Sequence, residues 1–275
     1  MVIQHNLTAM NSNRMLGITT KQQAKQSEQL ASGYRINRAA DDAAGLTISE
    51  KMRSQIRGLN RSSANAQDGV SLIQVAEGAL NEAHSILQRM NELATQAAND
   101  TNTSADRVAI QKEIDALTKE LDRISSTTQY NTMNVLNGTF TKKQLQVGAL
   151  KGQTITINIK SMSAASLGIK VGNGANNTVS TNKSAGVAMD TFQKAISRVS
   201  GMRSDLGAIQ NRLEHTIANL DNVTENTQAA ESRLRDTDMA SAMVDYSKNN
   251  ILAQAGQSML AQANASKQGI LTLLQ

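Results

Sequence analysis

The chain has 275 residues, of which 39% are hydrophobic and 2% aromatic, and it has no Trp, Pro or Cys. A compact globule of this length normally fills its core with large aromatic side chains, so a compact enzyme is disfavoured. The absence of cysteine excludes disulfides, thiolate catalysis and zinc–thiolate sites. The net charge of +5 arises within residues 1–61, which hold nine Lys/Arg and four Asp/Glu. A chain without proline can form long uninterrupted helices, so we expect an elongated helical protein.

The first predicted helix lies within residues 1–34 and is polar, with a thin apolar stripe that includes Leu7 and Met10. A long helix is then predicted from about Leu46 to Ala98. Thr47-Ile48-Ser49-Glu50 matches a Ser/Thr-x-x-Glu capping box at its start. Apolar residues follow at spacings of three, four or seven, which is the seam of a coiled-coil-like helix. These are Met52, Ile56, Leu59, Ala66, Val70, Ile73, Leu80, Leu87 and Ala94.

A second long helix is predicted after a turn at 99–103, capped by Thr103 or Ser104 and ending near Ser125–Thr128. Its stripe is Ile110, Ile114, Leu117, Leu121 and Ile124. The sequence TITINI at 154–159 alternates with period two and predicts a strand, which could pair with 143–147. Residues 171–184 are rich in Gly, Asn, Ser and Thr and predict an exposed loop.

A third long helix is predicted from near Val187, with Phe192, Val199, Leu206 and Leu213 on its seam. The last segment, from Asp236 to Gln275, is predicted as a weakly amphipathic helix. Like residues 1–34, it is too polar to bury much surface alone and would be marginal in isolation. We therefore expect the two ends to pair with each other or with copies of the chain.

Motifs of catalytic or metal chemistry are missing from the sequence. The three histidines, His5, His84 and His215, are far apart, and no phosphate-binding loop, nucleophile elbow or calcium loop is present. Asp41 and Asp42 precede a helix and complement its dipole. We expect no cofactor, no metal, no membrane insertion and no cleaved signal peptide. The basic N-terminal segment leaves open a nucleic-acid-binding arm, but a single Tyr34 is poor support for base stacking.

Several stretches of the chain resemble bacterial flagellin. They are LASGYRINRAADDAAGL at 30–46, NAQDG at 65–69, AEGAL at 76–80, AAESRLRDTDMA at 229–240 and LAQAN at 260–264. Their order is that of the family, and the resemblance covers about residues 1–160 and 187–275. It implies a mainly α, elongated, discontinuous helical bundle with coiled-coil-like long helices and a small β-hairpin region near 143–160.

The resemblance also implies a filament subunit, not an enzyme, that serves swimming motility. Residues 1–43 with 236–275 would form the inner core, and 44–170 with 187–235 the outer layer. The short loop 171–186 would replace the large variable domains. The polymerisation residues that this implies are Leu7, Met10, Met239, Met243, Tyr246, Leu252, Met259, Leu273 and Leu274. Filaments need contacts between different faces of identical subunits.

The implied partners are further copies of the chain, a secretion chaperone on the C-terminal helix, and the filament cap and hook-junction proteins. The implied location is the bacterial flagellum, reached by type III export. The resemblance further implies recognition by Toll-like receptor 5 in innate immunity. The receptor-binding residues would be Leu87, Gln88, Arg89, Glu92, Leu93, Gln96, Ile110, Glu113 and Arg212. Many recognised flagellins have an arginine where this chain has Asn91, and the loss weakens binding by about 1–3 kcal/mol if the lost bond was to a charged partner.

Three alternatives to the filament subunit remain at this point. A hook–filament junction protein shares terminal helices of this kind, although the density of matches at 35–46 and 229–240 argues against it. A nucleic-acid binder would show a binding constant that falls steeply with salt. An enzyme would need a pocket that the sequence does not reveal.

Overall fold

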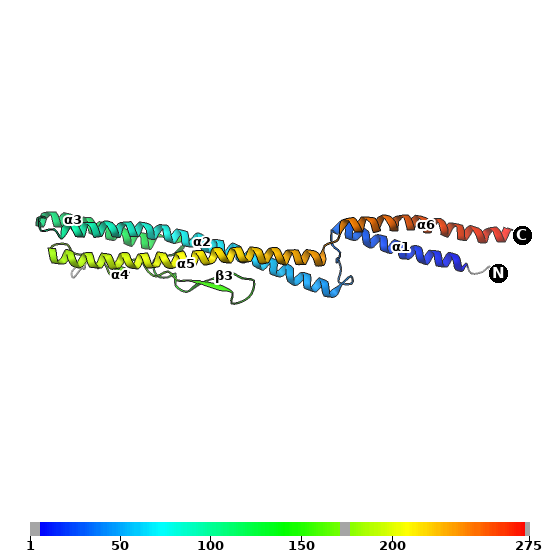
Figure 1. The fold of residues 1–275 in the computed structure, drawn as a ribbon, viewed down its shortest axis with the longest axis horizontal. Helices are drawn as coiled ribbons and strands as arrows, with labels where there is room; N and C mark the ends of the chain where they lie inside the picture. Colours follow the sequence, from blue (N-terminus) through cyan, green and yellow to red (C-terminus); the bar gives the residue numbers. More distant parts are fainter. Residues whose placement is uncertain (1–5, 171–176, 273–275) are drawn as a thin grey trace. The chain divides into compact units, whose positions relative to one another are not determined.

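The computed structural model describes residues 6–170 and 177–272, with side chains as far as residue 266. These residues divide into two compact units (Figure 1). The terminal unit comprises 6–56 with 225–272, and the central unit is Arg57–Thr224. The boundaries fall within two long helices, α2 (Ala43–Ala97) and α5 (Asn182–Arg235). The prediction of a mainly helical chain with long helices and a small hairpin region is confirmed.

In the terminal unit, α1 (Leu7–Ser32) and α6 (Met239–Thr272) lie side by side and antiparallel (Figure 1). Asn6 caps α1, since its side chain accepts the Ala9 N–H at 3.1 Å, and its amide donates to the Ala263 carbonyl at 3.0 Å. Helix α1 ends at Gly33, whose φ of +73° suits glycine because other residues are strained there. Of the two alternatives that the sequence left open, the structure shows the first: the two chain ends pair with each other.

Backbone hydrogen bonds join the residues that follow α1 to the end of α5 and the short link before α6. The Arg35 N–H donates to the Arg235 carbonyl at 2.7 Å, and the Thr237 N–H donates to the Gly33 carbonyl at 3.0 Å. The Arg235 guanidinium lies 4.6 Å from the centre of the Tyr34 ring, within cation–π range. These contacts fix the α1–α6 pair at one end through the backbone, which side-chain patterning could not reveal.

The central unit packs α2, α3 (Ser104–Thr127) and α5 around one hydrophobic core. The helices are antiparallel neighbours: Arg89 on α2 pairs with Glu113 on α3, and Glu77 on α2 pairs with Arg203 on α5. The predicted seam of α2 is buried here, since Ala66, Ile73, Leu80, Leu87 and Ala94 all have no exposed surface. Phe192 of α5 is also fully buried in this core.

The structure shows where three of the predicted helices begin. Helix α2 begins at Ala43, so the predicted Thr47–Glu50 capping box is wrong, and the Thr47 hydroxyl instead donates to the Ala43 carbonyl. Asp42 accepts the Gly45 N–H at 2.8 Å and takes the capping role. Thr103 caps α3 in a capping box with Asp106. Helix α5 begins at Asn182, not Val187, because Thr181 and Ser184 exchange side-chain to backbone hydrogen bonds that start it earlier.

The predicted loop 171–186 is therefore helical from residue 182, and residues 171–176 lie outside the described part. The predicted hairpin is present: β3 (Lys143–Gln146) pairs antiparallel with β4 (Thr154–Ile157), with Lys143 opposite Ile157. Its alternating isoleucines, Ile155, Ile157 and Ile159, are buried.

A second hairpin, β1 (Gln129–Tyr130) with β2 (Met133–Asn134), was not predicted. Its turn residues Asn131 and Thr132 both have positive φ, the two-residue geometry that suits a hairpin. A short helix, α4 (Ala164–Leu167), follows β4 and is capped by Ser163.

Candidate functional site

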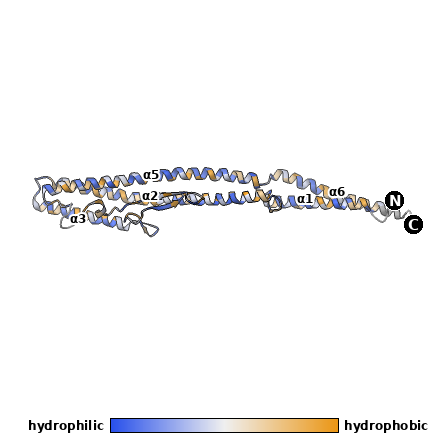
Figure 2. Ribbon diagram, turned by 90° about the horizontal axis from the view of Figure 1, so that it is seen from below, coloured by the Kyte–Doolittle hydropathy of each residue, from blue (hydrophilic) through white to orange (hydrophobic). Residues whose placement is uncertain are grey.

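Exposed apolar side chains gather on the terminal unit. Ten of the 17 large apolar side chains that are exposed in the described chain lie on α1 and α6. The same unit holds only four of the 39 buried hydrophobic residues, three of them alanine: Ala9, Ile36, Ala242 and Ala253. Apolar and polar residues alternate along both helices and do not separate into blocks (Figure 2). The α1–α6 pair therefore leaves its larger apolar side chains uncovered.

Most of the predicted polymerisation residues lie on this surface. Tyr246 is half-buried, and Leu273 and Leu274 lie outside the described residues. The exposed ones are Leu7, Met10, Met239, Met243, Leu252 and Met259.

Four further exposed apolar residues were missed by the sequence analysis: Met15 and Ile18 on α1, and Val244 and Ile251 on α6. Met15 and Ile18 follow Leu7 and Met10 at helical spacing, so extending that stripe would have found them. Val244 and Ile251 lie off the face that carries Met239 and Met243, so a search for a single stripe passes over them.

Apolar residues point in several directions from α6. At about 100° per residue, Val244 and Leu252 are rotated by about 140° and 220° from Met239 around the helix axis. Ala242 and Ala253 are buried. A helix that is apolar on several sides is typical of one that is enclosed by other protein. One neighbouring helix, α1, covers only one of these sides.

A groove of about 340 Å³ runs between α1 and α6. It is lined by side chains of both helices, including Met15, Leu16, Leu252 and Met259. The helices approach closely at Gly256, where an added Cβ would come 3.3 Å from a Leu16 methyl carbon. The exposed apolar surface thus includes a recess as well as ridges.

On the central unit, Arg89 forms a small charged cluster with two acids. Its Nη2 and Nε donate to Glu113 Oε1 at 2.9 and 3.1 Å, and its Nη1 lies 3.4 Å from Glu92 Oε2. The hydrogen bonds that Arg89 donates to the Glu113 carboxylate, and then the charge of that carboxylate, raise the pKa of the Arg89 guanidinium. All three side chains are about half exposed or more. Arg89 is therefore charged, accessible and held in position by its neighbours.

The structure brings together only part of the predicted receptor-binding set. Gln88 and Gln96 are exposed near the Arg89 cluster on α2, and Gln88 bonds to His84 at 3.0 Å. Burial removes three residues from the set that a partner could touch: Leu87, Leu93 and Ile110 are at most 8% exposed. Their side chains pack in the core between α2, α3 and α5.

Arg212 lies well away from Arg89. The next residue, Leu213 on α5, packs against Gly69 of α2, where an added Cβ would come 3.3 Å from a Leu213 methyl carbon. Gly69 lies 20 residues before Arg89 on α2. At 1.5 Å per residue this separation is about 30 Å. Arg212 therefore belongs to a different part of the central unit, beside Thr156 and Asn158 of the hairpin segment.

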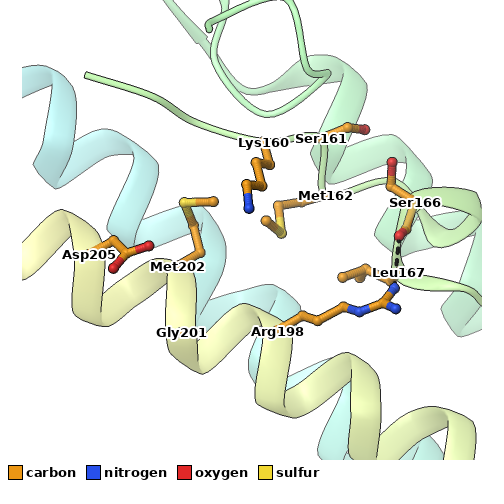
Figure 3. A pocket seen from close by; sticks show the side chains of 9 residues that line it. All are labelled: Lys160, Ser161, Met162, Ser166, Leu167, Arg198, Gly201, Met202 and Asp205. Carbon is orange, nitrogen blue, oxygen red and sulfur yellow. Dashed lines mark hydrogen bonds between the residues drawn. The ribbon is translucent and has the colours of Figure 1, made fainter. Parts of the chain in front are cut away.

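The central unit also has an open groove of about 450 Å³ between α5, α4 and the segment after β4 (Figure 3). Lys160, Arg198 and Asp205 line it together with Met162 and Met202. Arg198 donates to the Ser166 carbonyl at 3.1 Å. None of the described lining residues is a histidine or cysteine.

Part of the excess positive charge is engaged within the terminal unit. Lys25 lies 2.8 Å from Asp41, and Arg38 lies 2.9 Å from Glu28. The hydrogen bond from Lys25 is the main cause that lowers the pKa of the Asp41 carboxyl. These pairs favour a structural role for at least two of the basic residues.

Within the described ranges, no helix combines the length and apolarity that crossing a bilayer requires. Likewise, histidine and acidic side chains form no cluster of three suited to a metal ion in that part of the chain.

Comparisons with known proteins agree on one family. Residues 3–141 match the bacterial flagellin N-terminal helical region, and residues 189–274 match the bacterial flagellin C-terminal helical region. The chain is 52% identical to a flagellin of Halalkalibacterium halodurans, with both chains covered in full. It is 49% identical to the flagellar filament 31.3 kDa core protein of Treponema maltophilum, again over both full lengths.

Among solved structures, a protein described as flagellar and hook-associated, from Vibrio parahaemolyticus, shares the fold with a TM-score of 0.60. It is 13% identical and covers 71% of this chain and 100% of its own. That identity supports a common fold only, and the full-length matches to flagellins argue against the junction-protein alternative. The chain therefore belongs to the flagellin family, a structural protein of the flagellar filament and not an enzyme.

Proposed function

We propose that this chain polymerises through the uncovered surfaces of α1 and α6 into a filament that serves swimming motility. The observation that carries the proposal is the set of ten exposed large apolar side chains on two helices that bury almost none of their own. Removing the exposed part of these side chains from water favours association of the terminal helices.

In this proposal, residues 1–43 with 236–275 form the inner layer of the filament, and 44–170 with 187–235 form the outer layer. The compact units of the single chain divide elsewhere, at 56/57 and 224/225. The two divisions differ because the layers are defined by contacts between subunits, whereas the compact units are defined by contacts within a single subunit.

The test compares the full-length protein with a version lacking residues 1–43 and 236–275. Both are mixed with short filament fragments and imaged by negative-stain electron microscopy, after circular dichroism has confirmed that each is helical. We expect only the full-length protein to elongate the fragments. Elongation by the truncated version would contradict the role of α1 and α6, and failure of both would contradict polymerisation itself.

An uncovered α6 also supports a secretion chaperone that shields this helix before assembly, with export by the flagellar type III route. We include contacts with the filament cap and hook-junction proteins in the proposal. A chaperone that binds α6 should slow elongation in proportion to its concentration, which the same imaging assay can measure.

We also propose, as a second function, binding to Toll-like receptor 5 through the Arg89 cluster. Support comes from the exposure of Arg89, Glu92 and Glu113 and from the ion pairs that hold the guanidinium in place. Preformed charge-assisted donors of this kind are typical anchors of a binding surface. Gln88 and Gln96 add accessible polar groups on the same helix.

The receptor proposal can be tested by measuring the affinity of the receptor ectodomain for Arg89→Ala and Arg123→Ala. Arg123 is a matched control because it is exposed and pairs with Glu120 at 2.6 Å on α3. We expect Arg89→Ala to weaken binding about tenfold or more, as loss of an anchor does, and Arg123→Ala to have little effect. Asn91→Arg should strengthen binding. Equal affinities for the wild type and Arg89→Ala would contradict the proposal.

A further inference from the structure

Methionine is concentrated on the uncovered surface of the terminal helices. Five methionines of α1 and α6 are exposed, each by about half or more: Met10, Met15, Met239, Met243 and Met259. In the central unit, Met90, Met162 and Met202 are at most 5% exposed and Met189 is partly buried, while Met133 on the β1–β2 hairpin is 41% exposed. The chain has no cysteine that could react first with an oxidant. The accessible sulfur of α1 and α6 therefore lies where the proposed function requires apolar contact.

The thioether of an exposed methionine reacts directly with a peroxide. A sulfur lone pair attacks one peroxide oxygen, the O–O bond breaks, and the other oxygen leaves as water or an alcohol. Sulfur loses two electrons and becomes a sulfoxide, and the peroxide is reduced. The product is polar and chiral, where the thioether was flexible and apolar.

The position of two of these methionines makes the change consequential. Met15 and Met259 line the groove between α1 and α6, one from each helix. Sulfoxides there would place two strong dipoles in a recess lined by Leu16 and Leu252 on one hand and by Asn11, Ser12 and Thr19 on the other. A neighbouring subunit that packs on this surface would bury those dipoles, which costs free energy unless each finds a hydrogen-bond donor.

We propose that these five methionines are a peroxide-sensitive modification site that controls the assembly competence of the unpolymerised chain. This inference rests on the proposed function, since it requires α1 and α6 to be the polymerising elements. Oxidation prevents the free subunit from adding to a filament, and burial in the filament protects subunits that have already assembled. The fold of the central unit is expected to persist because Met90, Met162 and Met202 are buried in its core, away from the oxidant.

The experiment treats unpolymerised protein with hydrogen peroxide, locates sulfoxides by peptide mass mapping, and measures the elongation of filament fragments. We expect sulfoxide at the five sites and elongation slowed by about tenfold or more, with an unchanged unfolding midpoint. Incubation with both methionine sulfoxide reductases should restore elongation, because each reductase acts on one sulfoxide epimer. Normal elongation by protein that carries sulfoxide at all five sites would overturn the inference.

Two variants separate the site from general damage. Replacing all five with leucine, a volume-conserving change, should preserve elongation and make it insensitive to peroxide. Met133→Leu is the matched control, because Met133 is exposed on the β1–β2 hairpin of the central unit, and this variant should remain sensitive. Equal loss of elongation in the five-leucine variant after peroxide would overturn the inference. If the five-leucine variant does not elongate even without peroxide, the test is the oxidised wild-type protein: restored elongation after reductase treatment supports the inference, and no restoration overturns it.

Protection in the filament gives an independent readout. Assembled filaments exposed to peroxide should gain much less sulfoxide at the five sites than free subunits, while Met133 serves as an internal reference. Equal oxidation of the five sites in both forms would overturn the inference. Failure of untreated wild-type protein to elongate would instead contradict the proposed function on which the inference rests.

Discussion

The terminal and central units are both built from long, polar, proline-free helices, yet they bury apolar surface very differently. The central unit holds 35 of the 39 buried hydrophobic residues of the described chain, including Phe192, Leu87 and Ile157. The terminal unit holds mostly small buried residues and exposes its large ones. The difference arises because three helices and a hairpin share one core in the central unit, whereas α1 packs mainly against α6 within the described residues.

This comparison separates two uses of the same kind of sequence. In the central unit, apolar spacing specifies a core that stabilises the single chain. In the terminal unit, apolar residues that a monomer cannot cover favour association, since exposed apolar patches of this kind mark interaction surfaces. Substitutions in the two regions should therefore change different measured quantities.

The largest expected effect is on the stability of the central core. Phe192→Ala removes a ring that has no exposed surface, and the cavity left behind should lower the free energy of unfolding by about 3–5 kcal/mol. Urea denaturation followed by circular dichroism measures this loss. A change below about 1 kcal/mol would mean that the core around Phe192 is loosely packed and can collapse.

A substitution on α6 should change assembly and leave folding alone. Val244 is 68% exposed, so Val244→Ser should alter the free energy of unfolding by no more than about 0.5 kcal/mol. If Val244 is buried between subunits, the critical concentration for filament growth should rise by about tenfold. Val108→Ser on α3 is the matched control, since Val108 is 55% exposed on the central unit. Equal effects of both variants on growth would remove the distinction between the two surfaces.

The start of α3 offers a smaller test within the central unit. Thr103→Ala removes the hydroxyl that accepts the Asp106 N–H and should cost about 1 kcal/mol of stability. Thermal unfolding measures the loss. Ser104→Ala serves as its neighbour control, because Ser104 is the first helical residue and not the cap.

The same cap predicts a pH dependence. Hydrogen bonds from Thr103 lower the pKa of the Asp106 carboxyl in the folded state. Folding therefore favours the ionised form, and the contribution is fully present above the unfolded pKa of about 3.9. It is lost as the pH falls through the lower folded pKa. The stability difference between wild type and Asp106→Asn should shrink on acidification, and a difference that is constant with pH would contradict this account.

The smallest expected effect is at the Arg89 cluster. Its ion pairs are exposed and screened by solvent, so Arg89→Ala should leave the thermal midpoint of the central unit unchanged. This expectation matters for the receptor assay, because a folded Arg89→Ala variant makes any loss of binding interpretable. A lowered midpoint would assign Arg89 a structural role.

Periodicity along the chain was enough to locate the long helices and their buried sides. The seven-residue recurrence of Ala66, Ile73, Leu80, Leu87 and Ala94 predicted a seam, and all five are buried. This seam places Leu87 in the core, and the apolar stripe of α3 does the same for Ile110. The family resemblance had instead implied that Leu87 and Ile110 contact the receptor. Where the two conflict, periodicity agrees with the observed burial, since it reports directly on which side of a helix faces its neighbours.

The features that the sequence analysis missed depend on competition between nearby capping and turn-forming residues. Residues 47–50 match a capping box, but Asp42 caps the helix instead, so α2 begins at Ala43. Asp42 lies four residues before Leu46, the predicted start. The β1–β2 turn uses Asn131 and Thr132 at positive φ, and threonine is not a residue that signals such a turn.

The sequence by itself determined the helical class, the central seam and the β3–β4 hairpin, because each depends on spacing between near neighbours in the chain. Only the tertiary structure decided that Arg89 meets Glu113, that Arg212 lies about 30 Å away, and that ten large apolar residues of α1 and α6 remain uncovered. Those facts depend on which helices lie side by side and in what register. Contacts between residues distant in sequence set that register, and no local pattern encodes it.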